Sequence, residues 1–404
     1  MSSGLRIGLI TKEWPPQVYG GAGVHVVQLS QALRNQPNIE VDVHCFGGPR
    51  NDANGYNTPA GFENSNAALQ ALATDLAIAD NLSGVDVIHS HTWYANFAGF
   101  TANLLHGIPH VVSSHSLEPL RPWKAEQLGG GYQISSWLER ISYESADAII
   151  AVSQGMKRDI LRAYPSLNPS KIFPILNGID TKKYTPMFNE NVLTERGISG
   201  RYALFVGRIT RQKGLAHLLR AWKIANPDIG LVIAAGSPDE PGIGQEIAAL
   251  IKELQTDRSN IWWFEKMLPQ SELITLLTHA DFFICPSIYE PLGIVNLEAM
   301  ACETAVLASD VGGIPEVVID HETGELVHYP SALDRDATSR DDEFEAALAS
   351  KIRHFSQHPE LLEKYGKAGR KRAIAEFSWQ TIASQTITLY SDLISQSKRK
   401  NIRE

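Results

Sequence analysis

The chain has 404 residues, 43% of them hydrophobic, and a formal net charge of −9 at pH 7. One hydrophobic core seldom supports so long a chain, so we expect two domains of somewhat under ~200 residues each. The negative charge argues against nonspecific binding to nucleic acid or to an anionic membrane surface, because both attract a basic protein.

The first half of the chain alternates short β-branched runs with amphipathic segments, a pattern typical of βαβ units. Strands are expected at residues 5–11, 41–46, 85–89, 110–114, 148–152 and 172–176. Helices are expected between them at residues 24–33, 67–79, 95–105, 134–146 and 154–163. Such units form a mostly parallel sheet that helices cover on both faces. Residues 177–197 lose the periodicity and gain glycine, proline and charge, which predicts an inter-domain linker.

The alternation restarts after the linker and predicts a second doubly wound domain. Its strands are expected at residues 202–206, 229–235, 261–264, 281–285 and 305–308. Helices follow at residues 341–355 and 359–376, and residues 377–379 introduce a last helix that ends near 395, with Ser378 as its expected N-cap. The predicted fold class is therefore α/β, with doubly wound domains at residues 1–180 and 198–376.

The three cysteines and the lack of a long apolar run indicate in which cellular compartment the protein works. Cys45, Cys285 and Cys302 are too few and too scattered for a disulfide framework, and no pair has the spacing of a zinc knuckle. The chain starts without the features of a signal peptide, and no apolar run approaches the ~18 residues of a membrane span. We therefore expect a soluble, cytoplasmic protein with reduced cysteines.

A glycine-rich loop follows the first strand, where doubly wound sheets bind ligands. Residues 12–25 read KEWPPQVYGGAGVH. Gly20, Gly21 and Gly23 would let backbone amides approach a phosphate or sugar closely, and a helix begins directly afterwards. The loop is longer than the dinucleotide-binding fingerprint and lacks its acidic residue after the next strand. A flexible turn is the alternative interpretation.

Two basic residues lie near the start of the second domain, in the run LFVGRITRQKG at residues 204–214. Arg208 leaves the strand end and Lys213 follows five residues later, so both can converge on one diphosphate and neutralise it as a leaving group. Arg211 is a competing candidate. A merely basic helix start is the alternative, but cations there oppose the helix dipole.

Two glutamates flank the start of a helix expected over residues 294–301. The loop at residues 291–293 leaves the first N–H groups of this helix facing the end of the strand at 282–285, which favours a phosphate held without a metal. Glu290 can then reach sugar hydroxyls, and Glu298 can accept a hydrogen bond from a ribose. In the alternative interpretation Glu298 is solvated and Glu290 only complements the helix dipole.

His115 ends the fourth expected strand. The loop behind it supplies hydrogen-bonding groups and an aromatic face of the kind that sugar recognition uses: Glu118, Arg121, Trp123 and Lys124. A buried core histidine is the alternative interpretation for His115.

His89 and His91 share one strand face and could suggest a metal. No third ligand lies nearby in the sequence, so no metal site is expected. The loop at residues 310–316, DVGGIPE, also opens a helix, and a structural role is favoured for it.

Taken together, these stretches resemble retaining glycosyltransferases of the GT-B fold. Residues 12–25, 41–46, 113–124 and 287–300 are similar to the actinobacterial-type glycogen synthases and the related α-maltose-1-phosphate synthases, and the resemblance covers nearly the whole chain. It implies two Rossmann-like domains facing a cleft, with residues 377–404 packing back on the first domain.

The resemblance also implies a reaction and the residues that perform it. A glucosyl group would pass from ADP-glucose, the favoured donor, or UDP-glucose to the 4-hydroxyl of a glucan or of glucose 1-phosphate, with retention and without a cofactor or metal. The positions of Arg208 and Lys213 bind the donor phosphates in this family, and Glu298 binds the ribose. The transferred glucose is contacted by Glu290 and His115, with the backbone amides of Gly293, Ile294 and Val295 assisting.

The first loop departs from one family pattern. Other bacterial glycogen synthases carry KTGGLG near the start, whereas residues 19–23 here read YGGAG without that lysine. Acceptor use therefore need not match theirs. The competing hypotheses are a glycosyltransferase with a lipid or another sugar as acceptor, a nucleotide-sugar epimerase, and a non-catalytic nucleotide-sugar sensor. Donor turnover with several acceptors distinguishes them.

Overall fold

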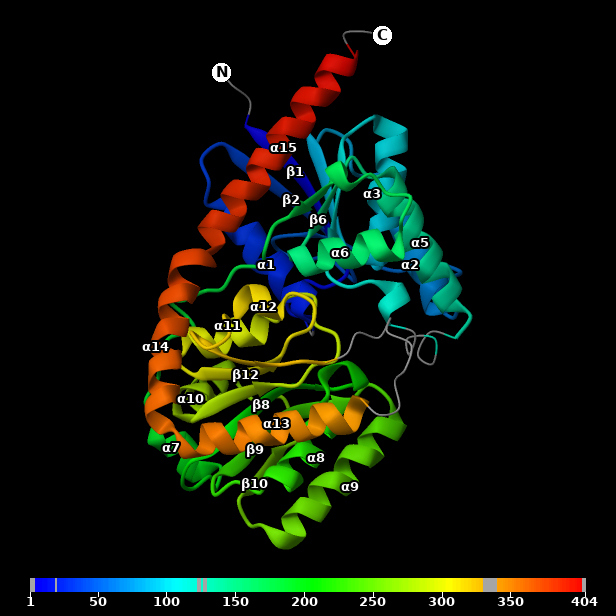
Figure 1. Ribbon diagram of the computed structural model, residues 1–404. Helices are drawn as coiled ribbons and strands as arrows, with labels where there is room; N and C mark the ends of the chain where they lie inside the picture. The colour runs from blue at the N-terminus through cyan, green and yellow to red at the C-terminus, as the bar shows by residue number, and fades with distance from the viewer. Residues whose placement is uncertain (1–3, 19, 122–124, 126–128, 330–339, 402–404) are drawn as a thin grey trace. The chain divides into compact units, whose positions relative to one another are not determined.

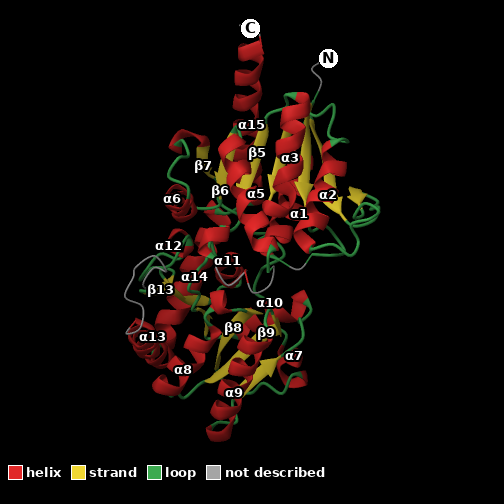
Figure 2. Cartoon of the chain, turned by 90° about the vertical axis from the view of Figure 1, so that its right-hand side faces the viewer, coloured by secondary structure: helices red, strands yellow, loops and turns green. Residues whose placement is uncertain are grey.

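The computed structural model describes residues 4–18, 20–121, 125, 129–329 and 340–401. The chain divides into two compact units, one made of Met1–Gly178 with Trp379–Glu404 and the other of Ile179–Ser378. Each unit is built on a parallel β-sheet with helices on both of its faces (Figures 1 and 2). The predicted α/β fold class is confirmed.

The first unit contains a seven-stranded sheet, within the described residues, in the order β3-β2-β1-β4-β5-β6-β7. All neighbouring strands are parallel. The order reverses between β1 and β4, and ligand crevices form at such switch points beyond the carboxyl ends of the strands. The strands are β1 (Leu5–Thr11), β2 (Ile39–Phe46), β3 (Asn54–Tyr56), β4 (Val87–His91), β5 (His110–Ser114), β6 (Ala148–Ala151) and β7 (Ile172–Pro174).

The helices of this unit are fixed by local caps and by burial. Asn66 caps α2 by accepting a hydrogen bond from the Ala68 N–H, and Ser153 caps α6 through the Met156 N–H. The helices are α1 (Gly21–Arg34), α2 (Ala67–Ala79), α3 (Trp93–His106), α5 (Gly131–Ser145), α6 (Gln154–Ala163) and α15 (Trp379–Asn401), with 3-10 turns η1 (Glu118–Leu120) and η2 (Pro169–Lys171).

The C-terminal helix completes the core of the first unit. Helix α15 lies beside α1 (Figure 1), and its Trp379, Ile382 and Tyr390 join the buried cluster that contains Ile7 and Leu9 of β1. Residues from opposite ends of the sequence therefore share one core. Residues 377–379 were expected to introduce this helix, and it begins at Trp379, but it continues to Asn401, past the expected end near residue 395.

The second unit contains a six-stranded sheet, within its described residues, in the order β10-β9-β8-β11-β12-β13, again all parallel. Its strands are β8 (Tyr202–Ile209), β9 (Gly230–Pro238), β10 (Ile261–Phe264), β11 (Phe282–Cys285), β12 (Ala305–Ser309) and β13 (Gly324–Val327). Its helices are α7 (Glu190–Glu195), η3 (Arg211–Lys213), α8 (Leu215–Ala225), α9 (Pro241–Asp257), α10 (Gln270–His279), α11 (Ile294–Ala301), α12 (Ile314–Val317), α13 (Arg340–Gln357) and α14 (Pro359–Glu376).

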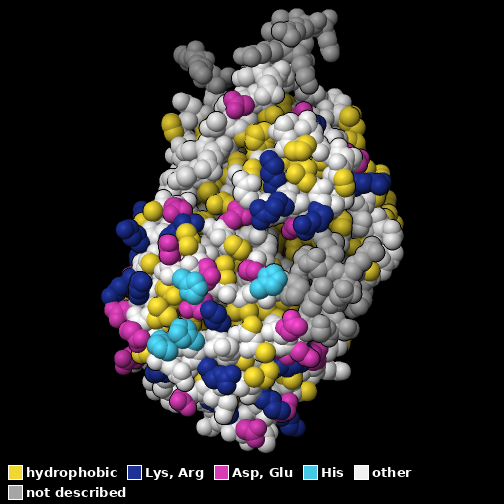
Figure 3. Space-filling model, in the orientation of Figure 1, with side chains coloured by type: hydrophobic (Ala, Val, Ile, Leu, Met, Phe, Trp, Pro, Cys, Tyr) yellow, Lys and Arg dark blue, Asp and Glu magenta, His cyan; other side chains and the backbone are white. Residues whose placement is uncertain are grey.

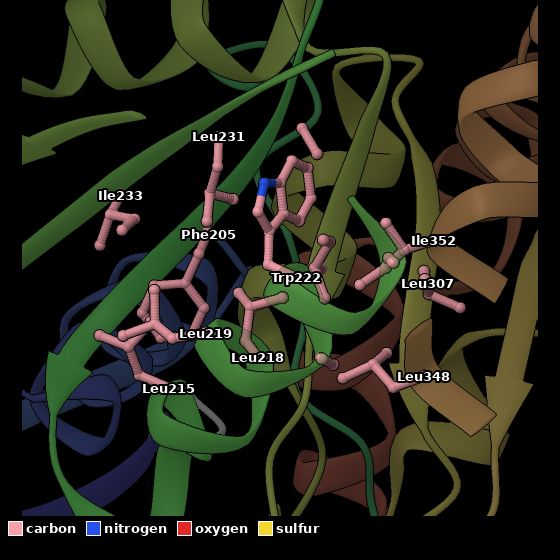
Figure 4. Packing of buried hydrophobic residues seen from close by; sticks show 14 of the residues in the cluster. Phe205, Leu215, Leu218, Leu219, Trp222, Leu231, Ile233, Leu307, Leu348 and Ile352 are labelled. Atoms are coloured by element: carbon pink, nitrogen blue, oxygen red, sulfur yellow. The ribbon is translucent and has the colours of Figure 1, made fainter. Parts of the chain in front are cut away.

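Trp222 of α8 is the largest fully buried side chain in this second core (Figure 4). It packs in a cluster to which β9 contributes Leu231 and Ile233, β12 contributes Leu307, and α13 contributes Ile352. Truncation of such a side chain to alanine typically costs ~3–5 kcal/mol of stability. The core thus joins α8, the sheet and α13, and it fixes the loop that leaves β8.

Most predicted elements are present, and the exceptions have physical reasons. Strand β4 continues to His91, whereas the predicted strand ends at His89. The prediction followed apolar residues, and it stopped too early because the last residues of β4 are polar although they are buried. Strands β3 and β13 and helix α7 were not predicted. Within the described residues, no helix has the length and apolar character needed to cross a membrane.

Candidate active site

A lysine and a glutamate meet at the switch point of the second sheet. Strands β8 and β11 are neighbours, and the chain winds away from them in opposite directions, so the loops after these two strands part at their carboxyl ends. The Lys213 Nζ lies 2.6 Å from the Glu290 Oε2, and their side chains are 19% and 10% exposed. The Ser287 hydroxyl also donates to that oxygen, at 3.2 Å. The two predicted residues therefore form an ion pair that is largely shielded from water.

Close backbone approaches hold these loops together. Gly214, with φ +66°, lies so near the loop after β11 that a Cβ would come within 1.9 Å of the Pro286 carbonyl oxygen. A Cβ on Gly312, with φ +57°, would come equally close to the carbonyl oxygen of Glu290, which accepts a hydrogen bond from the Gly313 N–H at 3.0 Å. Only glycine fits at these two positions. The loops after β8, β11 and β12 are thereby fixed around Glu290.

Arg208 is the penultimate residue of β8 and pairs with a different carboxylate. Its Nη1 lies 3.1 Å from Oδ1 and 3.0 Å from Oδ2 of Asp239, and the Arg208 side chain is 48% exposed. Burial opposes the charge of Lys213, but the Glu290 carboxylate outweighs it and the pKa of Lys213 is raised, with Arg208 acting in the opposite direction. Two cations thus lie near each other, each with its own counterion.

Helix α11 begins beside this ion pair with unused hydrogen-bond donors. Gly293, with φ +94°, precedes the helix and provides no side-chain cap. Within the described part of the chain, the backbone N–H groups of Gly293, Ile294 and Val295 donate no hydrogen bond. Free N–H groups at the positive end of a helix dipole favour an anion such as a phosphate.

Glu298 lies one turn inside α11 and is half-buried. Burial raises its pKa to about 7, while a hydrogen bond with Tyr184 and the charges of Lys183 and Lys213 oppose this rise. The Tyr184 hydroxyl also accepts a hydrogen bond from Gln270, at 2.8 Å. Tyr184 was not predicted as a site residue, because it lies in the segment interpreted as a linker and no periodic pattern marks it.

In the first unit, His115 belongs to a cluster of histidines at the ends of three elements. The His91 Nδ1 lies 2.9 Å from the His115 Nε2, and His25 of α1 packs edge-on against His115 with 4.7 Å between ring centroids. Burial lowers the pKa of His115 to about 4 and lowers the pKa values of His25 and His91 well below the usual range. All three rings are therefore neutral at pH 7.

The sequence did not reveal this cluster. One nitrogen from each of His25, His91 and His115 lies within 4.8 Å of the others, so the neighbours of His91 in this cluster come from distant segments and not from His89. His89 does not belong to this cluster, because its two ring nitrogens form hydrogen bonds with the Tyr390 hydroxyl at 2.6 Å and the Ser113 hydroxyl at 2.8 Å.

The glycine loop of the first unit surrounds a carboxylate. The Gly20 N–H donates to the Glu13 Oε2 at 2.8 Å, and a Cβ on Gly23 would lie 2.5 Å from that oxygen. Gly21 is the first residue of α1. The start of α1 thus accommodates negative charge, as an anion-binding position would. The role of Gly20, Gly21 and Gly23 in donor binding stays a prediction.

Of Glu118, Trp123 and Lys124, which the sequence predicts to contact the acceptor sugar, the structure describes only Glu118. Glu118 in η1 is fully buried, its Oε2 accepts a hydrogen bond from the Ser135 hydroxyl at 2.7 Å, and its N–H donates to Glu139 at 3.0 Å. These bonds hold η1 against α5, so the acceptor contact of Glu118 stays a prediction. Trp123 and Lys124 lie outside the described residues.

Surface charge agrees with the overall composition. On the face of the protein shown in Figure 3, Lys and Arg side chains lie interspersed with Asp and Glu. The formal net charge of −9 likewise predicts no extended basic surface of the kind that binds nucleic acid or an anionic membrane.

Comparison with known proteins connects these features to a family. Residues 19–183 match Glycosyltransferase Family 4, and residues 197–372 match Glycosyl transferases group 1. The chain is 51% identical over 391 residues to the alpha-maltose-1-phosphate synthase of Mycolicibacterium smegmatis, covering 96% of this chain and 99% of that protein. It is 28% identical over 422 residues to a glycogen synthase of Mycobacterium tuberculosis, covering 96% and 94%.

Solved structures confirm the fold. The sucrose-phosphate synthase of Thermosynechococcus elongatus superposes with a TM-score of 0.78 at 24% identity, covering 97% of this chain and 100% of that one. The catalytic domain of starch synthase IV from Arabidopsis thaliana, bound to ADP and acarbose, gives a TM-score of 0.73 at 17% identity over 98% of this chain and 100% of that one.

Proposed function

Because the chain belongs to the GT-B glycosyltransferases that join a family 4 region to a group 1 region, we propose that it transfers glucose from a nucleotide diphosphate glucose to glucose 1-phosphate. ADP-glucose is the favoured donor, and the product is an α-1,4-linked maltose 1-phosphate formed with retention. The observation that carries the reaction type is the placement of two cations and the free α11 amides at one switch point. The 51% identity to an alpha-maltose-1-phosphate synthase supports the choice of acceptor.

In the proposed donor complex, the diphosphate replaces the carboxylates that hold the two cations. Lys213 and Arg208 turn to the phosphate oxygens, and the N–H groups at the start of α11 donate to the same anion. Glu290 is thereby released to accept hydrogen bonds from the glucose hydroxyls. Glu298 accepts from the ribose, with Tyr184 orienting its carboxylate.

The transfer breaks the bond between glucose C1 and the diphosphate oxygen. Both bonding electrons leave with the nucleoside diphosphate, whose growing charge Arg208, Lys213 and the α11 amides stabilise. The acceptor 4-hydroxyl attacks C1 on the face that the diphosphate leaves, and its proton passes to a phosphate oxygen of the departing group. Catalysis then depends on position and electrostatics.

A direct test combines two donors with a graded set of acceptors. Purified protein is incubated with ADP-glucose or UDP-glucose and with glucose 1-phosphate, glucose, maltooligosaccharides or glycogen, and the products are identified by NMR. We expect maltose 1-phosphate in the α configuration from glucose 1-phosphate, with little transfer to glucose, which lacks the phosphate. An Arg208→Ala protein, prepared in parallel, reports any contaminating activity.

Other outcomes would identify another function. Elongation of glycogen without transfer to glucose 1-phosphate would make the protein a glycogen synthase, the activity named for the 28% identical relative. Hydrolysis or epimerisation of the donor without any acceptor would favour the epimerase hypothesis. Donor binding without turnover under all conditions would leave a nucleotide-sugar sensor.

A further inference from the structure

The contact between His91 and His115 must be a hydrogen bond between two neutral rings. Burial keeps both imidazoles uncharged at pH 7, and a neutral imidazole has one N–H and one bare nitrogen. At 2.9 Å, the His91 Nδ1 and the His115 Nε2 are within hydrogen-bond distance, so one of them donates and the other accepts. The direction of this bond fixes which nitrogen of His115 carries its proton.

The surroundings of His91 decide the direction. Its Nε2 is buried and has no hydrogen-bond partner within the described residues. If His115 were the donor, His91 would carry its own proton on that buried Nε2, as an N–H without an acceptor. Orphaned buried N–H groups are rarer in proteins than under-satisfied acceptors. The arrangement in which the His91 Nδ1–H donates leaves only a bare lone pair there.

We propose that His91 is a positioning residue: its Nδ1–H donates to the His115 Nε2 and thereby fixes the His115 proton on Nδ1. Within the described chain, the hydrogen bond that His115 makes through its ring is the one at Nε2. His115 consequently presents an N–H donor at Nδ1, which suits the oxygen of a sugar hydroxyl. The substrate part of this inference rests on the proposed function, whereas the position of the proton does not.

The ring of His91 is held firmly enough to impose this choice. His91 is 1% exposed at the end of β4, and its ring lies 4.1 Å from the His89 ring, measured between centroids. His89 is itself fixed by hydrogen bonds to Tyr390 of α15 and Ser113 of β5. His25 also packs against both His91 and His115. The proton position on His115 is thus determined by four elements of the first unit.

A metal ion is the competing interpretation of the same cluster. An ion would require bare nitrogens on both His91 and His115, whereas these two nitrogens lie 2.9 Å apart, at hydrogen-bond distance. The groups that act on the pKa values of His25, His91 and His115 are other histidines and Asn177, with no carboxylate among them in the described chain. Metal-bound histidines are usually oriented by a carboxylate or carbonyl partner. A shared proton therefore explains the geometry better than an ion.

The tautomer can be observed directly in the full-length protein. Long-range ¹⁵N–¹H correlation spectra of ¹⁵N-histidine-labelled protein distinguish protonated from bare ring nitrogens, and His115→Gln identifies the His115 signals. We expect His115 with a protonated Nδ1 and a bare Nε2. A protonated Nε2 on His115 would overturn the proposal. Signals of His25, His91 and His115 that shift together with ZnCl₂ and return with EDTA would replace it with a metal site.

Two variants of His91 separate positioning from packing. The side-chain amide introduced by His91→Asn can donate near the place of the lost Nδ1–H, whereas His91→Ala removes the donor. We expect His91→Asn to retain the His115 tautomer, and His91→Ala to give a mixture of both tautomers and a kcat lower on the order of tenfold, with little change in KM. Equal tautomer populations in both variants would refute the role of His91.

The position of the His115 proton and the proposed glucosyl transfer can fail independently in these experiments. The wild-type spectrum decides the tautomer even if His91→Ala does not fold, which thermal unfolding of each variant reports. A protonated Nδ1 in a protein that does not transfer glucose, or in which His115→Gln retains full activity, would defeat the proposed role in catalysis. It would leave the proton assignment intact.

Discussion

Replacing Lys213 with methionine should lower both the stability of the protein and its turnover. The change keeps the length of the side chain but removes the partner of Glu290, whose carboxylate is 10% exposed and retains the Ser287 hydroxyl at 3.2 Å as a donor. Removing one partner of a buried ion pair typically costs ~3–5 kcal/mol, and the partial exposure of this pair favours the lower end, about 3 kcal/mol. Lys213→Met combined with Glu290→Gln should recover most of this loss, because no charge is then left unpaired.

Arg208→Ala provides the matched control. The Arg208 side chain in its pair with Asp239 is 48% exposed. Exposed ion pairs contribute only ~0–1 kcal/mol to stability, so the variant should be nearly as stable as the wild type. Turnover should nevertheless fall on the order of a hundredfold in both Arg208→Ala and Lys213→Met, because the proposed transfer needs each charge most as the diphosphate leaves.

Urea unfolding followed by circular dichroism gives the stabilities, and turnover at saturating donor and acceptor gives the kinetic effect. The reasoning about the ion pair would be refuted if Lys213→Met were as stable as the wild type, or if the double variant were no more stable than Lys213→Met. Near-native turnover in both single variants would remove these residues from the catalytic site.

Three further predictions follow from the site and its surroundings. Glu298→Gln should raise the KM for donor more than it lowers kcat, and Glu290→Gln should do the reverse; the opposite pattern would exchange their roles. Burial and the charge of Glu118 raise the pKa of Glu139 to about 8. The stability that its protonated form contributes is complete below the ordinary pKa of ~4.5 and is lost as the pH rises through about 8, so Glu139→Gln should flatten the decline in Tm over this range, and parallel declines would contradict this. Prolonged dialysis against EDTA should leave turnover unchanged, because in the proposed donor complex cations and amides hold the diphosphate; a loss that Mg²⁺ restores would disprove this.

Regular alternation made the fold class predictable, while features defined by pairing alone were missed. Helices α2, α6 and α14 have the predicted bounds, because their apolar residues recur at the helical period. Strand β3 reads NGY, a turn-like sequence that becomes a strand only because it pairs with the end of β2. Helix α7 has no buried residue, so no hydrophobic pattern marks it.

The candidate site was predictable where its residues lie in one loop each. Lys213 and Glu290 were placed at strand ends from their local sequences, and the fold brings their charged atoms together. The partners Tyr184 and Asp239 were missed, because each comes from a segment that carries no motif of its own. The contact between His91 and His115 depends on the register of adjacent strands, which local spacing does not specify.

The two ion pairs of the second unit have a consequence for selectivity among anions. Neither Lys213 nor Arg208 presents bare positive charge, since Glu290 and Asp239 already neutralise them. A chloride or a single phosphate that enters must displace a carboxylate and gains little from the exchange. A ligand that gives a diphosphate to both cations and hydroxyls to the released Glu290 uses every group at once. If the proposed donor complex forms, the counterions would act as a filter that keeps the common inorganic anions of a cell out of the site.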